Sequence, residues 1–231
     1  MSPTSSANIP LPSLIKSLIP LFRRAILSGL MICMACVIFL SIPDKIIGAG
    51  MFSLGLLVVV VFGLPLFTGK IGYLFHDREI TVLQMCVIWL GNLLGAIIMA
   101  RIAGCTMQHD IFAARVNSLV KTTLPTSNVK TFFAAVMCGI FMYIAVESWK
   151  LSQKTAPGAI IVILCVMGFI LTGSLHSIAW MGYIELSDTT RFFSSPFSGR
   201  PLGFILLVTF GNAFGSQLAS FLELAFPTAK K

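Results

Sequence analysis

The sequence predicts an all-α membrane protein with six transmembrane helices. Of its 231 residues, 57% are hydrophobic and only 10% are charged, which excludes an ordinary soluble domain. Apolar stretches of about 20 residues, each long enough to cross roughly 30 Å of hydrocarbon, recur along the chain. They cover residues 24–42, 46–66, 80–104, 128–149, 158–187 and 201–226. Because these stretches use nearly the whole length, residues 1–231 are expected to form a single transmembrane domain.

The first 21 residues precede the apolar stretches and are expected to lie partly at the membrane surface or to be disordered. Residues 11–21 read as a short amphipathic segment, and residues 1–10 are rich in Ser and Pro. Arg23 and Arg24 before the first stretch resemble the start of a signal peptide, but five more stretches follow, which favours an uncleaved first helix. This organisation favours the inner membrane of a bacterium, with a eukaryotic intracellular or plasma membrane as the alternative.

The formal net charge is +8. With the N-terminus in the cytoplasm, cations divide almost evenly between the two faces, so they do not decide the orientation. The outer loops would carry only Asp44, Asp110 and Asp188 against their cations. An electropositive outer face would concentrate small anions. The alternative is that these cations only anchor the helices among the lipid headgroups.

Two short motifs divide the chain into similar halves. GNLLGA at 91–96 lies in the third stretch, and GNAFGS at 211–216 lies in the sixth. The second stretch is interrupted at LFTGK (66–70) and the fifth around LTGSLHSIAW (171–180). The halves therefore read as two three-helix repeats of inverted topology with broken helices 2 and 5, which is typical of membrane transporters and channels.

The interruptions predict a cavity inside the bundle. Unpaired backbone N–H and C=O groups at membrane depth cost several kcal/mol each in lipid, so they must line a cavity or be buried in protein. The two interruptions are therefore expected to face each other across a pore. Either GN motif alone is compatible with ordinary helix packing through small residues, but the matched pair with two matched breaks favours the repeat.

At these residues the chain resembles the formate/nitrite transporter family. The family's ELFTGN corresponds to PLFTGK at 65–70, and its EHSIANM corresponds to LHSIAWM at 175–181. Asn92 and Asn212 stand where the family has its GN motifs. The order and spacing match over nearly the whole chain. The resemblance implies a homopentamer of aquaporin-like protomers in membrane lipid, each with its own pore.

The resemblance also implies a set of pore residues. The family's inner constriction corresponds to Phe52, Leu56 and Phe169. Its outer constriction corresponds to Leu66, Phe67 and Met142. The family's vestibule lysine matches Lys121, with Lys130 as the alternative. Four family polar residues are replaced here, by Pro65, Gly139, Leu175 and Trp180. The polar network around the central His176 is therefore thinner, so this chain either differs in selectivity or has departed from transport.

Residue chemistry favours passage of a protonated acid. Stripping water from a bare anion costs of order tens of kcal/mol in a dry medium and several after relaxation. Protonating an ordinary carboxylate at pH 7 costs only about 4 kcal/mol. Lys121 is expected to attract the anion and Thr68 to offer a hydroxyl hydrogen bond. His176 would donate a proton or, staying neutral, orient the substrate, and Asn92 and Asn212 would cap the broken backbone or line the pore.

The predicted function is a channel or transporter for small monovalent weak-acid anions such as formate, nitrite or hydrosulfide, with protons as partners. The alternatives are a pore for a small neutral solute and a non-conducting membrane scaffold of the same fold. The sequence shows no nucleophile–base pair and no metal-ligand spacing, so no enzyme, cofactor or nucleic-acid function is expected. Lys70, in place of the family's Asn, either snorkels to the cytoplasmic surface or adds a second cation near the break.

Overall fold

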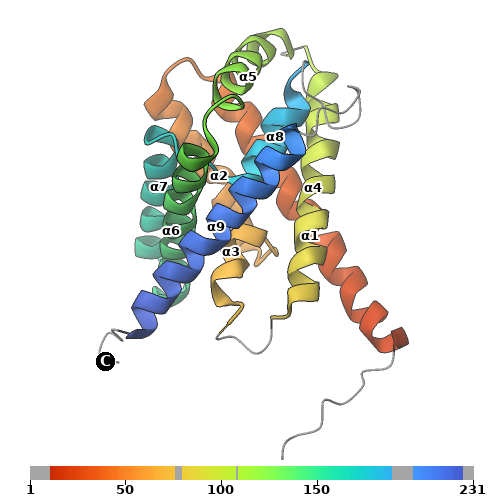
Figure 1. The fold of residues 1–231 in the computed structure, drawn as a ribbon, viewed down its shortest axis with the longest axis vertical. Helices are drawn as coiled ribbons and strands as arrows, with labels where there is room; N and C mark the ends of the chain where they lie inside the picture. Colours follow the sequence, from red (N-terminus) through yellow and green to blue (C-terminus); the bar gives the residue numbers. More distant parts are fainter. Residues whose placement is uncertain (1–10, 76–79, 108, 189–199, 226–231) are drawn as a thin grey trace, which may run out of the picture.

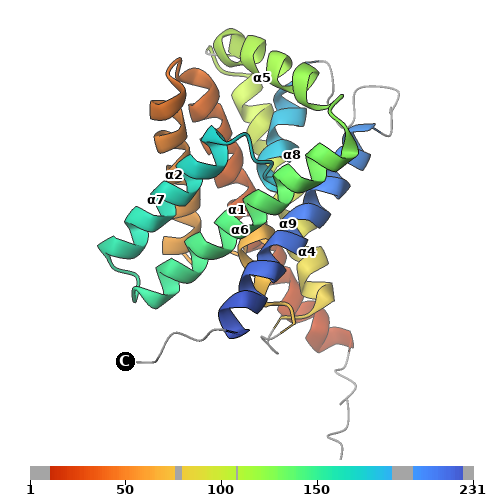
Figure 2. The same ribbon diagram turned by 60° about the vertical axis from the view of Figure 1, so that its left-hand side comes forward.

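The protein is an elongated bundle of helices with one helix lying across its end (Figures 1 and 2). The structure, a computed structural model, describes residues 11–75, 80–107, 109–188 and 200–225. These residues contain α-helices, one 3-10 turn and no strand. The first half holds α1 (Leu11–Ser41), α2 (Lys45–Val61), α3 (Phe67–Lys70), the 3-10 turn η1 (Ile71–Tyr73) and α4 (Val82–Gly104). The second holds α5 (His109–Thr123), α6 (Asn128–Leu151), α7 (Ala156–Leu171), α8 (Ser177–Leu186) and α9 (Arg200–Ala225).

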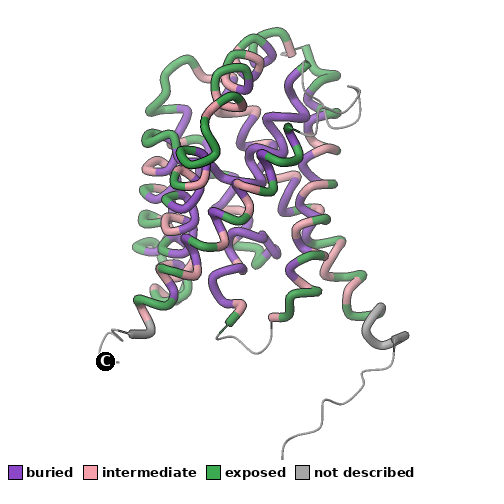
Figure 3. Tube along the Cα trace, viewed as in Figure 1, coloured by how far each residue is buried: buried purple, intermediate pink, exposed green. Residues whose placement is uncertain are grey.

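Length and surface character of the helices fit a membrane protein. Among the described residues, four segments are long and apolar enough to cross a bilayer, namely Lys16–Ser41, Val82–Gly104, Asn128–Leu151 and Arg200–Glu223. The shorter α2 and α7 are also apolar. Buried positions face the middle of the bundle, whereas its flanks are largely exposed (Figure 3). Large apolar side chains such as Leu90, Phe210 and Phe221 are exposed there, as lipid-facing residues would be.

The two halves repeat the same construction. In each, a long helix is followed by a short helix that stops inside the bundle, a non-helical segment, another short helix and a final long helix. Both α2 and α7 end two residues before a glycine with positive φ, Gly63 at 60° and Gly173 at 72°. Glycine adopts this left-handed conformation without the steric penalty that a Cβ would bring. Pro65 follows the first of these glycines and prevents α2 from continuing.

Small residues bring the long helices of each half into close contact. On α4, a Cβ at Gly95 would lie 1.9 Å from the carbonyl oxygen of Ile26 on α1. On α9, a Cβ at Gly215 would lie 2.0 Å from the carbonyl oxygen of Val136 on α6. Both distances are far shorter than any real contact, so these positions require glycine. The small residues of the GN motifs thus set the separation of α1 from α4 and of α6 from α9.

We expect Gly215→Ala to destabilise the protein by about 1–3 kcal/mol, because the added methyl group must push the α6 backbone away. This corresponds to a fall in the midpoint of thermal unfolding of about 5–10 °C, measured on the purified protein in detergent. Gly203→Ala on the same helix is the matched control, because nothing lies within 4 Å of its Cβ position. Equal midpoints for the two variants would contradict this packing.

Residues 11–21 form the first turns of α1 and continue into it without interruption. One element differs from the sequence-based expectation. The segment between α4 and α6 forms α5, a helix the sequence analysis did not predict. The Arg115 Nη1 of α5 donates to the carbonyl oxygens of Leu40 at 2.9 Å and Ile42 at 2.6 Å, which fixes α5 across the end of α1. The predicted segment 1–10 lies outside the described residues.

Candidate functional site

The two interrupted segments meet at the centre of the bundle through one side-chain contact. Thr68 on α3 and His176 at the start of α8 are 1% and 2% exposed. The Thr68 Oγ1 lies 2.8 Å from the His176 Nε2. The structure therefore brings together two residues that are far apart in the sequence and belong to different halves.

The backbone of α8 determines how the imidazole of His176 is protonated. His176 is the N-cap of this helix, and its Nδ1 accepts a hydrogen bond from the Ala179 N–H at 3.1 Å. A nitrogen that accepts from an N–H carries no proton, so the neutral ring has its hydrogen on Nε2. Nε2 then donates to the Thr68 Oγ1, which leaves the threonine hydroxyl hydrogen for another acceptor. Protonating Nδ1 would break the helix cap.

Asn92 and Asn212 hold the broken backbone in place. The Asn92 Oδ1 accepts from the Phe67 N–H at 2.9 Å, and its Nδ2 donates to the Ala25 and Pro65 carbonyls at 2.8 and 3.1 Å. Both asparagines are fully buried. Asn92 is expected from the sequence either to cap the broken backbone or to line the pore. Its hydrogen bonds to backbone groups are those of a cap.

The Asn212 side chain makes the equivalent set of bonds in the second half. Its Oδ1 accepts from the Ser177 N–H at 2.8 Å. Its Nδ2 donates to the Ala135 and Leu175 carbonyls at 2.8 and 2.7 Å. Asn212 thus binds the backbone on both sides of His176, at Leu175 and at Ser177.

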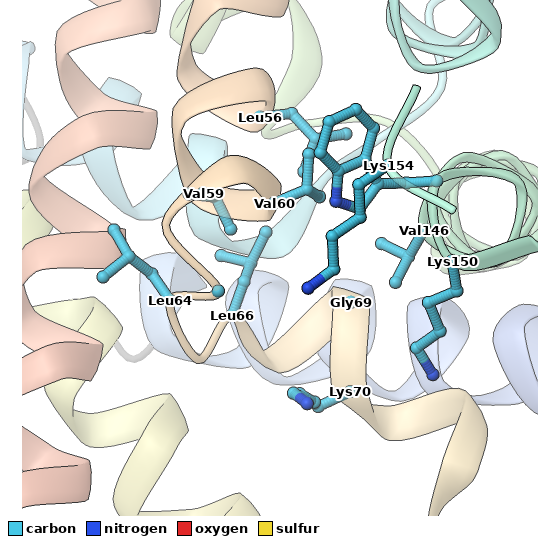
Figure 4. Close-up of a pocket in the computed structure, with 12 residues that line it drawn as sticks. Leu56, Val59, Val60, Leu64, Leu66, Gly69, Lys70, Val146, Lys150 and Lys154 are labelled. Carbon is cyan, nitrogen blue, oxygen red and sulfur yellow. The ribbon is translucent and has the colours of Figure 1, made fainter. Parts of the chain in front are cut away.

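Two cavities open toward opposite ends of the bundle. The terminal-side cavity, named for the end at which α1 begins and α9 ends, has a volume of about 310 Å³. Its lining includes Leu56, Leu66, Lys70 and Lys154 (Figure 4). The α5-side cavity, of about 180 Å³, reaches His176 from the other end. Among the described residues, lysines line both cavities and no Asp or Glu side chain lines either.

Two aromatic rings follow the central histidine on the α5 side, and one of them contacts it. The Phe169 ring stacks on the His176 ring at a centroid distance of 5.7 Å and meets the Phe52 ring edge-on at 5.8 Å. Phe169 lines the α5-side cavity, and Leu66 lines the terminal-side cavity.

The order of the two constrictions along the bundle is the reverse of the expected one. With the termini inside the cell, Phe52 and Phe169 lie toward the outside and Leu66 toward the inside. The reason is that α2 runs from the α5 end toward its break, so Phe52 comes before the break (Figure 1). Leu56 of the expected inner set does line the terminal-side cavity, and Phe67 and Met142 are buried.

Lys45, rather than the expected lysine, is the cation at the α5-side cavity. Lys45 lines this cavity, and its Nζ donates to the Leu171 carbonyl at the end of α7 at 3.4 Å. Lys121 and the alternative Lys130 are both exposed and are not among the residues that line the cavity. On α5, the residues that do so are Leu119 and Thr123, on either side of Lys121 in the sequence.

We expect Lys45→Gln to reduce uptake of a small anion by about threefold to tenfold at low anion concentration and low salt, because the cavity loses its positive potential. High salt should shrink the difference by screening. Lys121→Gln removes the same charge from the nearby exposed surface and should change uptake little. The measurement is initial uptake into proteoliposomes, and a larger loss for Lys121→Gln than for Lys45→Gln would contradict the assignment.

The structure explains two of the four positions at which this chain lacks the family's polar residue. A Cβ at Gly139 would lie 2.2 Å from the Asn212 carbonyl oxygen, so no side chain fits where α6 and α9 cross. Trp180 is buried, lines the α5-side cavity and packs edge-on against Phe204 at a centroid distance of 5.0 Å. It therefore fills space beside the passage with an aromatic ring.

Comparison with known proteins decides the family. The model of the formate/nitrite transporter family matches residues 14–224, nearly the whole chain. The chain belongs to the formate/nitrite transporter family. It is accordingly an integral membrane protein from a family of transporters and channels.

The chain is similar in sequence to a nitrite transporter and a formate channel. The nitrite transporter NirC of Escherichia coli (strain K12) is 29% identical over 205 residues, covering 82% of this chain and 74% of the relative. The formate channel FocA of the same organism is 28% identical over 195 residues, covering 76% and 68%.

Solved structures with the same fold include a pentameric formate channel with formate bound. It superposes with a TM-score of 0.72 at 22% identity, covering 91% of this chain and 95% of the other. A second, an ion channel of the formate/nitrite transporter family, gives a TM-score of 0.73 at 20% identity, covering 94% and 92%.

Proposed function

We propose that this protein is a homopentameric channel or transporter that passes small monovalent weak-acid anions, such as formate or nitrite, as their neutral acids. Each protomer would form one passage from six crossings. In this arrangement α2 with α3 is the broken second crossing, and α7 with α8 is the broken fifth. The proposed location is the inner membrane of a bacterium.

The observation that carries the proposal is the neutral Thr68–His176 pair between two cavities with lysines and no carboxylates. Lysines at both ends draw an anion toward the passage from either side. Between them, the rings of Phe52 and Phe169 and the side chain of Leu66 offer no charge to a bare anion. A neutral acid passes such a constriction at far lower cost than the anion.

The hydrogen-bond directions indicate what the central pair does. Because His176 donates from Nε2 to the Thr68 oxygen, the threonine hydroxyl hydrogen is free to bond an oxygen of the substrate. The proton that neutralises the anion then comes from water in the cavity, and His176 orients the passing acid. Of the two roles expected for His176, this geometry favours orientation over proton donation. A donated Nε2 proton would leave a costly imidazolate.

Uptake of labelled formate and nitrite into proteoliposomes tests this function. Formate uptake above that of protein-free liposomes should rise as the external pH is lowered from 7.5 to 5.5, because the protonated fraction rises. Uptake of urea or glycerol without formate would contradict the proposal in favour of a pore for neutral solutes. No uptake of any solute would contradict it in favour of a non-conducting scaffold.

A further inference from the structure

We propose that the terminal-side cavity is a binding site for an organic monocarboxylate with a short hydrocarbon body. The site is separate from the Thr68–His176 pair and is formed by α2, α3 and the end of α6. Three observations carry it: a hydrogen-bond donor without a partner, a turn that fixes a lysine at the cavity, and an apolar wall behind the cations.

The donor is the indole N–H of Trp149. Trp149 on α6 is 9% exposed and lines the cavity. Its Nε1 is buried and has no hydrogen-bond partner among the described residues. A buried donor left unpaired costs about 1–3 kcal/mol, so such groups in native proteins usually serve a ligand or water. An acceptor placed in this cavity would satisfy it.

The turn after α6 places Lys154 at the same cavity. The backbone of Gln153 and Lys154 is left-handed, with φ of 54° and 63°, a conformation that residues other than glycine rarely adopt. The Lys154 N–H donates to the Trp149 carbonyl at 3.1 Å and closes the turn. Figure 4 shows the Lys154 side chain extending over α3 into the cavity. The strained turn thus holds a cation at the cavity that the indole also lines.

The charge around the cavity favours a monoanion. Lys70 and Lys154 line it without an ion-pair partner among the described residues. Lys150 also lines it but lies 3.8 Å from the Glu147 Oε2 and over the Tyr73 ring. A single carboxylate can therefore accept from the Trp149 N–H and from Lys154 or Lys70.

The rest of the wall selects for a hydrocarbon body. The remaining lining is mainly apolar, namely Leu56, Val59, Val60, Leu64, Leu66 and Val146. A volume of about 310 Å³ is at the lower end for small-molecule sites and far exceeds the space one formate needs. A carboxylate with three to five carbons fits both the volume and the apolar wall. Because Leu66 forms part of this wall, an occupant would also block the passage from the terminal side, a consequence that rests on the proposed function.

Binding is measured directly with 4,4,4-trifluorobutyrate, followed by ¹⁹F NMR on the full chain in nanodiscs. We expect saturable binding that the neutral amide of the same acid does not displace. Trp149→Phe, which keeps the ring and removes the N–H, should weaken binding by about tenfold, as should Lys154→Gln. Lys16→Gln, an exposed α1 lysine at the same end, is the control and should bind like the wild type.

The outcomes separate this site from the proposed function. Binding that survives Trp149→Phe, Lys154→Gln and Lys70→Asn unchanged, or that is no stronger than binding of the amide, overturns the site. If Trp149→Phe does not fold, trifluorobutyrate binding to Lys154→Gln and Lys70→Asn decides whether the site exists. Formate uptake without trifluorobutyrate binding overturns the site and leaves the proposed function intact. Binding without any formate uptake supports the site and overturns the proposed function.

Discussion

Replacing Asn212 with Ala is expected to prevent stable folding of the protein at physiological temperature. The change leaves the buried Ser177 N–H and Leu175 carbonyl without this partner and removes the extra hydrogen bond to the Ala135 carbonyl, which keeps its own bond within α6. Each such group costs about 1–3 kcal/mol, so together they remove a large share of the stability of an ordinary protein. We expect the midpoint of thermal unfolding in detergent to fall by about 10 °C or more.

The variant Asn212→Asp distinguishes the contribution of the hydrogen bonds to stability from that of the side-chain volume. The aspartate keeps the shape and the acceptor at Oδ1, but it turns a second oxygen toward two carbonyls, so it should destabilise at least as strongly as Ala. Asn128→Ala is the control, because Asn128 is exposed at the start of α6. Thermal midpoints for Asn212→Ala and Asn128→Ala that agree within error would show that the asparagine does not hold the break.

Thr68→Val is expected to reduce formate uptake by about tenfold to a hundredfold while leaving the fold intact. Valine has nearly the shape of threonine, so the buried position stays filled. It removes the oxygen that accepts from the His176 Nε2 and the hydroxyl hydrogen offered to the substrate. The loss of this bond in an apolar constriction accounts for the expected size of the effect.

Thr68→Ser restores the hydroxyl and should recover most of the uptake. The comparison is made on initial rates in proteoliposomes with equal amounts of pentamer, checked by size-exclusion chromatography. If the valine variant transports formate as fast as the wild type at each pH, the central pair has no part in passage. Loss of pentamer in the valine variant alone would instead assign Thr68 a structural role.

The broken helices could be predicted from sequence because membrane depth makes irregular backbone conspicuous. Gly63, Pro65 and Gly173 interrupt otherwise apolar stretches, and only a cavity or a buried partner can satisfy the exposed backbone there. By contrast, α5 was missed because it is short and not apolar enough to cross a membrane. Its buried residues Phe112, Val116 and Val120 recur every four residues, which is the signal that could have identified it.

The candidate site was only partly predictable, since its residues come together from distant parts of the chain. His176 and Thr68 stand beside the breaks, so the sequence singles them out, and the structure places them in contact. Lys45 was missed because it reaches the α5-side cavity from the start of α2, whereas Lys121 was chosen by its position before α6. Trp149 looks like an ordinary membrane-interface residue in the sequence. That its Nε1 lacks a partner depends on how α2, α3 and α6 pack together.

The claim that anions pass as neutral acids is tested most directly by measuring charge and protons together. Proteoliposomes carrying an internal pH dye are given a formate gradient while the membrane potential is set with potassium and valinomycin, and the flux in protein-free liposomes is subtracted. We predict that one proton enters with each formate and that the rate is independent of the membrane potential. A formate current that follows the potential, without acidification of the interior, would contradict the account.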